Sequence, residues 1–244
     1  MNDWFVTSIK SFPLPETARV VLKETDEEFV DIFKYSCGEI KVNMQYEKAG
    51  LASAISRAYV RKTVADKLLE AKKLLPAGYT FEILDAWRPF DVQMELFNSY
   101  KKQVAATCPT DIEEDELIKR VCEFVSYPDK SKKISYVHSS GGAVDLTVLD
   151  ADGNRLEMGT DFDDFTEKSY TVWYEENDPS AEAAKNRRLL NNVLLKCGFT
   201  NYPSEWWHYD YGDAFWAFYT NNNAIYISEF EEREVKNNDG SGAF

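Results

Sequence analysis

Two adjacent glycines, Gly141 and Gly142, separate His138 from Asp145 and constrain how the chain folds around them. On an unbroken strand the side chains alternate between two faces, so a His and an Asp seven residues apart would point in opposite directions. Glycine permits the tight turn or bulge that breaks this alternation. We therefore expect His138 on one arm of a turn and Asp145 on the next, both directed at a shared point.

The chain contains only two histidines, and the second, His208, lies in the aromatic segment 203–210. If that segment is a strand, Glu205 starts on the face opposite His208 and reaches the same centre only if the chain bends. Two imidazoles and one carboxylate suit zinc, and an open fourth position is typical of a catalytic site. We expect one zinc per chain, held by His138, Asp145 and His208. The residues alone leave two alternatives open: His138 in an ordinary surface turn, and the aromatic segment as a core strand.

Spacing of apolar residues and turn signals predicts alternating helices and strands along the chain. The expected helices are residues 55–75, a segment after Pro89, residues 110–125 with a capping box of Thr110 and Glu113, and residues 181–197. Residues 79–84 are predicted as a strand and 150–154 as a hairpin turn. The fold class expected is α+β, with a central, mainly antiparallel sheet, flanking helices and the zinc site on the sheet. No linker divides the chain, so residues 1–244 are predicted as a single domain, with 1–30 and 213–244 as peripheral segments.

The net charge of the chain argues against several classes of partner. Lys and Arg number 28 against 42 Asp and Glu, a formal charge of -14, which repels nucleic acid. No apolar run approaches the roughly 18 residues that span a bilayer, so no membrane partner is expected. The amino terminus lacks the pattern of a secretory signal, and the four scattered cysteines indicate reduced thiols, so we expect a cytoplasmic protein. The sequence gives no indication of oligomeric state.

The pattern His-x-x-Gly-x-Ala-x-Asp over residues 138–145, followed by Glu-x-Trp-His over residues 205–208, resembles the zinc site of the VanX-like D-alanyl-D-alanine dipeptidases. These enzymes belong to a wider group of D-Ala-D-Ala carboxypeptidases and lysostaphin-like peptidases. Further matching segments follow in the family's order, over roughly residues 30–212: Lys34-Tyr35, Trp87-Arg88-Pro89, Met158-Gly159, Phe162-Asp163 and Asn186-Arg187-Arg188-Leu189.

The resemblance implies a role for each matching residue. His138, Asp145 and His208 are implied as zinc ligands, Glu205 as general base, Arg88 as the stabiliser of the tetrahedral oxyanion, and Asp163 and Tyr35 as substrate-binding residues. One position departs from the family pattern, because Tyr136 stands where a serine is usual, two residues before the first histidine. That serine belongs to the substrate surroundings, so the departure bears on strict D-Ala-D-Ala preference and not on the zinc chemistry.

The expected activity is zinc-dependent hydrolysis of D-Ala-D-Ala or a similar small dipeptide, within peptidoglycan and cell-wall metabolism. Two alternatives stand beside it: a carboxypeptidase that trims peptidoglycan stem peptides, and a zinc-binding interaction domain without catalysis. Glu205 favours an enzyme over the interaction domain, because a purely structural zinc site needs no base.

Overall fold

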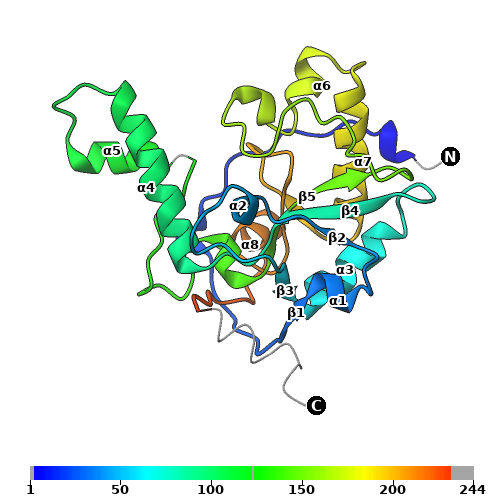
Figure 1. The fold of residues 1–244 in the computed structure, drawn as a ribbon, viewed down its shortest axis with the longest axis horizontal. Coiled ribbons are helices and arrows are strands. Elements are labelled where there is room, and N and C mark those ends of the chain that lie inside the picture. The colour runs from blue at the N-terminus through cyan, green and yellow to red at the C-terminus, as the bar shows by residue number, and fades with distance from the viewer. Residues whose placement is uncertain (1–2, 123, 232–244) are drawn as a thin grey trace.

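A five-stranded mixed sheet with the strand order β2-β4-β5-β7-β6 forms the centre of the protein (Figure 1). The computed structural model describes residues 3–122 and 124–231. The strands of this sheet are β2 (Lys41–Val42), β4 (Thr80–Asp85), β5 (Ala143–Leu149), β6 (Thr200–Asn201) and β7 (His208–Asp210). The pairings β4-β5, β5-β7 and β6-β7 are antiparallel, whereas β2 runs parallel to β4. Three of the four pairings are thus antiparallel, as a mainly antiparallel sheet requires, and the long connection between β2 and β4 makes the one parallel pair possible.

Strand β5 is buried along its whole length between β4 and β7. Its side chains alternate, so Val144, Leu146 and Val148 enter the main hydrophobic core. Asp145 and Thr147 therefore point to the opposite face of the sheet. At β5 the sheet thus has one apolar face and one polar face, and Asp145 lies on the polar face.

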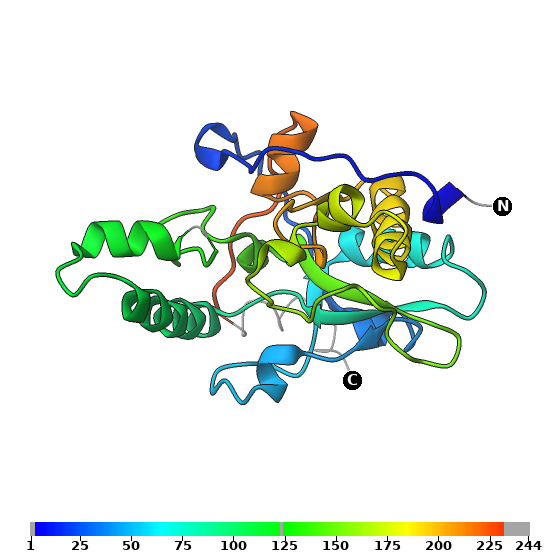
Figure 2. The same ribbon diagram turned by 90° about the horizontal axis from the view of Figure 1, so that it is seen from above.

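Helices α3 (Lys62–Lys72) and α7 (Glu182–Lys196) pack together over the apolar face of the sheet. Figure 2 shows α2 (Gln45–Lys48) on the other side of the sheet. The remaining short elements are α1 (Ile32–Tyr35), α6 (Trp173–Asn177), α8 (Ala214–Thr220) and a separate antiparallel pair, β1 (Phe29–Asp31) with β3 (Tyr59–Arg61).

A helical arm formed by α4 (Phe90–Thr107) and α5 (Glu114–Val121) extends away from the sheet (Figure 1). It has a hydrophobic cluster of its own, built from Phe97, Leu117, Val121 and Val125. Among the described helices, none is both long and apolar enough to cross a membrane.

The observed helices and turns confirm two of the local predictions and correct two others. Helix α7 matches the prediction to within one residue at each end, and the Asp150 amide donates to the Asn154 carbonyl in the expected hairpin turn. The helix predicted from residue 55 begins only at Lys62, because residues 59–61 pair with β1 as a strand. The capping box is wrong: α5 begins after Glu113, and no side chain caps it.

The terminal segments are more integrated than expected. Leu22 forms a parallel β-bridge with Ala224, and Tyr226 is buried against the main core. The Trp87 indole donates to the Glu229 carbonyl at 2.8 Å. Described parts of both terminal segments therefore contact the rest of the protein; residues 1–2 and 232–244 lie outside the described part of the chain.

Two neighbouring leucines of α7 test the position of the core. Leu194 is fully buried, whereas Leu195 is 36% exposed. Leu194→Ala should lower the free energy of unfolding by about 2–5 kcal/mol, because it removes buried apolar surface and leaves a cavity. Leu195→Ala should cost about 1 kcal/mol or less. Urea denaturation of both variants measures the difference, and equal losses would contradict the assignment of the core face.

Candidate metal and catalytic site

Asp145 of β5 and His208 of β7 lie directly opposite each other in the antiparallel ladder. Side chains in such a pair project from the same face of the sheet, so the register alone brings the two groups together. Asp145 Oδ1 lies 3.0 Å from His208 Nδ1. Both side chains are buried.

His138 comes from the short 3-10 helix η3 (Val137–Ser140) and not from a strand. Gly141 follows it with a φ of 73°, a left-handed conformation that glycine adopts without strain. A Cβ atom at Gly141 would also lie 2.2 Å from the Phe29 ring. This turn directs His138 Nε2 to within 3.2 Å of His208 Nδ1 and 3.4 Å of Asp145 Oδ2. The expected turn between the two ligand arms is present, although the site is only partly on the sheet.

The second ring nitrogen of each histidine has a hydrogen-bond acceptor. His138 Nδ1 lies 2.8 Å from the Ala86 carbonyl, and His208 Nε2 lies 2.9 Å from Asp210 Oδ1. Donation to these acceptors places the protons on the outer nitrogens and leaves His138 Nε2 and His208 Nδ1 as lone pairs that face each other. Outer carboxylate and carbonyl partners of this kind orient histidines that bind metals. Alternation along β7 could have indicated Asp210, since it follows His208 by two residues on the same face.

The three inner groups fit a tetrahedral zinc site. The ligand atoms of His138, Asp145 and His208 all lie within 4.8 Å of one another. Bonds of about 2.0–2.1 Å to a tetrahedral zinc place neighbouring ligand atoms about 3.3 Å apart. The two imidazole nitrogens are 3.2 Å apart, and Asp145 lies 3.0 Å from His208 through Oδ1 and 3.4 Å from His138 through Oδ2, all close to that value. Two lone pairs buried face to face also require a cation or a proton between them, and the donor set of two imidazoles and one carboxylate suits zinc.

Glu205 reaches the same centre because the chain turns before β7. The Glu205 amide donates to the Tyr202 carbonyl and the His208 amide donates to the Glu205 carbonyl, which is the bend expected from the sequence. Glu205 Oε2 lies 3.7 Å from His208 Nδ1. Burial raises the pKa of Glu205 to about 8, and the nearby Asp145 adds to the shift while His208 opposes it.

Arg88 is held on the other side of the three ligands by a set of buried partners. Its Nε donates to Asp85 Oδ2 and its Nη1 to Gln93 Oε1, both at 2.8 Å. Its Nη2 lies 3.3 Å from the Tyr46 hydroxyl. The Tyr136 hydroxyl donates to the Arg88 carbonyl at 2.8 Å. The tyrosine that stands in place of the family's serine therefore binds the backbone of this arginine. The guanidinium is therefore fixed before any ligand arrives.

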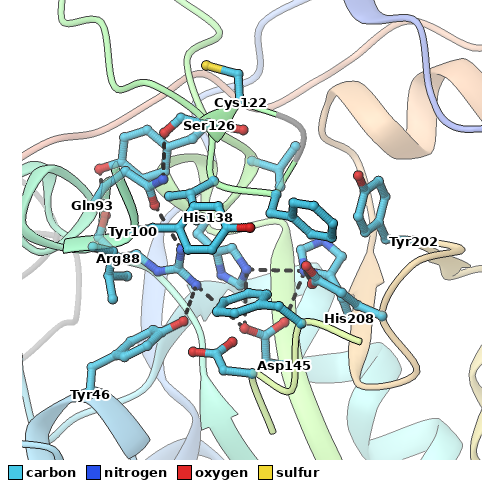
Figure 3. A pocket seen from close by; sticks show the side chains of 18 of the residues that line it. Tyr46, Arg88, Gln93, Tyr100, Cys122, Ser126, His138, Asp145, Tyr202 and His208 are labelled. Carbon is cyan, nitrogen blue, oxygen red and sulfur yellow. Dashed lines mark hydrogen bonds and ion pairs between the residues drawn. The ribbon is translucent and has the colours of Figure 1, made fainter. Parts of the chain in front are cut away.

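Asp163 lines the same cavity as Arg88 and Glu205. Figure 3 shows that Tyr46, Arg88 and the three metal-ligand candidates point into this cavity. Asp163 has a φ of 58°, which is unusual for a residue other than glycine. Burial raises the pKa of Asp163 to about 7, although Arg88 opposes the shift. The structure thus brings together six of the seven residues that the sequence singled out.

Tyr35 is the exception, and its expected role in substrate binding is not supported by its position. Its hydroxyl donates to Asp66 at 2.6 Å at an exposed site, and Tyr35 is not among the residues that line the cavity. Tyr46, which the sequence did not indicate, supplies the tyrosine hydroxyl of the site. A short helix carries each tyrosine, and only the path of the chain decides which of them faces the cavity.

The ligand assignment predicts that His138→Ala and His208→Ala each lose zinc. The wild-type protein should retain about one zinc per chain after dialysis, because three protein ligands hold it, whereas two leave a much weaker site. Elemental analysis measures the content, with Tyr35→Phe as a control that keeps its zinc. Unchanged zinc in either histidine variant would contradict the assignment, since the chain has no third histidine.

Comparison with known proteins agrees with this geometry. Residues 43–229, more than half of the chain, match the family described as D-ala-D-ala dipeptidase. A D-alanyl-D-alanine dipeptidase from Synechocystis is 28% identical over 181 residues, which cover 67% of this chain and 73% of the relative. One from Enterococcus faecium is 33% identical over 150 residues, which cover 60% of this chain and 69% of the relative.

Among solved structures, VanYB in complex with D-alanine-D-alanine aligns with a TM-score of 0.42 and 15% identity, over 68% of this chain and 81% of that chain. The family match includes the segment of each of the three metal-ligand candidates, Glu205 and Arg88. The chain belongs to the D-Ala-D-Ala dipeptidase family of metallopeptidases.

Proposed function

We propose that this protein is a zinc-dependent dipeptidase that hydrolyses D-Ala-D-Ala or a closely similar small dipeptide. The observation that carries the proposal is the arrangement of three zinc-compatible ligand atoms with a further carboxylate on one side and a fixed guanidinium on the other. The ligands are His138, Asp145 and His208, and the flanking groups are Glu205 and Arg88. The family match supports the same activity.

His138, Asp145 and His208 would hold the zinc, which would supply a nucleophile near neutral pH by lowering the pKa of a water. Glu205, which lies beside these ligands, would accept a proton from the attacking water and deliver it to the leaving amine. Its carboxylate is placed for both steps, because Glu205 Oε2 lies 3.7 Å from His208 Nδ1, at the edge of the three-ligand centre.

Arg88 stabilises the negative charge that develops on the carbonyl oxygen. Asp85 and Gln93 hold its Nε and Nη1, so the guanidinium needs no reorganisation during the reaction. Donors fixed in this way contribute more than mobile ones in a site that excludes water.

Asp163 binds the ammonium end of the dipeptide in this proposal. It lies in the cavity, and no described Lys or Arg other than Arg88 lines that cavity. A buried carboxylate pairs with an ammonium group and disfavours a substrate whose amino group is acylated, since the acyl group carries no charge and adds bulk. This preference would restrict the enzyme to free dipeptides.

No specific observation favours the two alternatives. The matched relatives are dipeptidases, and a zinc-binding interaction domain has no use for a base such as Glu205 or a fixed cation such as Arg88. A single domain over residues 1–244, a cytoplasmic location and a role in cell-wall metabolism stay predictions that accompany the proposal.

Replacing Glu205 with Gln tests the base. The change keeps size and hydrogen bonding but removes the proton acceptor, so zinc should stay at one per chain while kcat falls by roughly 10²- to 10⁴-fold. Zinc content, melting temperature and kcat are measured on one preparation, with the exposed Glu176→Gln as control. Loss of zinc would indicate a ligand, and full activity in the zinc-loaded variant would refute the mechanism.

Replacing Arg88 with Ala tests the oxyanion role. The variant should keep zinc and lose roughly 10²- to 10³-fold in kcat, the scale for one oxyanion donor. Steady-state kinetics on D-Ala-D-Ala measures the effect, with the surface variant Arg155→Ala as control. A rise in KM alone would make Arg88 a residue of uniform substrate binding.

A further inference from the structure

Residues 158–170, the Asp163 loop, connect the turn after β5 to helix α6 and place two residues in the cavity, Asp163 and Phe165. The only regular element in the loop is a single 3-10 turn, η4 (Glu167–Ser169). Within the described part of the chain, the loop takes part in no sheet ladder. Its position must therefore come from contacts with the rest of the protein.

Arg187 of α7 supplies these contacts from inside the protein. Its Nε donates to the Met158 carbonyl, its Nη1 to the Tyr170 carbonyl and its Nη2 to the Lys168 carbonyl, each at 2.8 Å. The side chain is 1% exposed. The three acceptors lie at the first residue of the loop and at its last turn, so one guanidinium ties both ends of the loop together.

A buried guanidinium that binds only backbone carbonyls is suited to fixing the path of a chain. Its planar fork presents donors at fixed angles, and three acceptors can meet it only when the loop closes in one geometry. The guanidinium carbon also lies 4.9 Å from the Tyr174 ring centre and 5.8 Å from that of Trp206. These rings leave the guanidinium little freedom to move.

The contacts continue from the ends of the loop to Asp163. The Ser169 hydroxyl donates to the carbonyl of Asp164, the residue after Asp163. The Trp206 amide donates to the Ser169 carbonyl, and its indole donates to the Thr160 hydroxyl at 2.8 Å. Asp163 itself has a φ of 58°, a left-handed conformation that is uncommon outside glycine and that aspartate tolerates better than most residues.

We propose that Arg187 is a positioning residue for substrate selection, which holds the Asp163 loop so that Asp163 meets the amino terminus of the substrate. The inference rests on the proposed function, because it takes Asp163 as the partner of the ammonium group. Arg187 touches neither the substrate nor the metal ligands in this role. It acts through the loop alone.

The test compares hydrolysis of D-Ala-D-Ala and N-acetyl-D-Ala-D-Ala by the zinc-loaded wild-type protein, Asp163→Asn, Arg187→Lys and the double variant. Asp163→Asn should lower the preference for the free amino group, the ratio of the two kcat/KM values, by about tenfold or more. Arg187→Lys should lower it comparably, mainly through KM, because lysine keeps the charge but cannot reach three carbonyls. The double variant should lose little more than either single variant, since both changes remove one interaction.

Arg188→Lys is the matched control. Arg188 is the next residue of α7 and binds the Glu175 carboxylate through two hydrogen bonds, at 2.7 and 2.6 Å, outside the Asp163 loop. This variant should lose stability without losing the preference for the free amino group. A general loss of stability therefore cannot imitate the expected result for Arg187.

Hydrogen exchange measures the position of the loop without reference to activity. Amides of residues 158–170 should exchange faster in Arg187→Lys than in Arg188→Lys. If Arg187→Lys does not fold, Ser169→Ala loosens the same loop by removing the bond to the Asp164 carbonyl, and the same two measurements apply.

An unchanged preference in a folded Arg187→Lys or Ser169→Ala protein would overturn the proposal, as would additive losses in the double variant. If the wild-type protein hydrolyses neither peptide, the proposed function fails and the selection role fails with it. Hydrogen exchange then still decides whether Arg187 holds the loop, so the two failures are distinguishable.

Discussion

The register between β5 and β7 is the constraint on which the rest of the site depends. It sets Asp145 opposite His208, on the face of the sheet that α3 and α7 leave uncovered. If one strand slipped by one residue relative to the other, its site residue, Asp145 or His208, would point into the apolar core. The neighbouring residues of that strand would then point into the cavity. The run Val144, Leu146 and Val148 resists such a shift, because each of these side chains is buried on the helix face. The apolar core thus fixes the geometry of the polar site.

Charge balance explains why so many polar groups are buried together. Asp85, Asp145 and Asp163 all lie close to Arg88, which is the cation shared among them. Burying several carboxylates beside one guanidinium is unfavourable unless each finds a partner. A divalent cation at the three-ligand centre and the ammonium group of a substrate would supply the missing positive charge, so the electrostatics favour the loaded enzyme over the empty one.

Helix α7 connects the core to the site. One side of it carries core leucines such as Leu189 and Leu190. The same helix carries Arg187, which binds both ends of the Asp163 loop, and Arg188, which binds Glu175 of α6. Because the helix packs in the core, its hydrogen bonds to the loop fix the position of the loop. This is how the loop can hold Asp163, the proposed partner of the substrate's ammonium group, in one place.

Sequence by itself indicated the candidate ligand set and much of the local structure around it. The glycines after His138 indicated a turn, and the alternation of side chains required the bend at Glu205; both follow from local backbone geometry, which a sequence pattern records. Helix α7 and the hairpin turn were predictable for the same reason. Only the tertiary structure decided that Tyr46 and not Tyr35 faces the cavity, that β2 runs parallel to β4, and that residues 224–230 pack on the body. These features depend on contacts between segments that are distant in the chain, and a local pattern of side chains does not specify such long-range contacts.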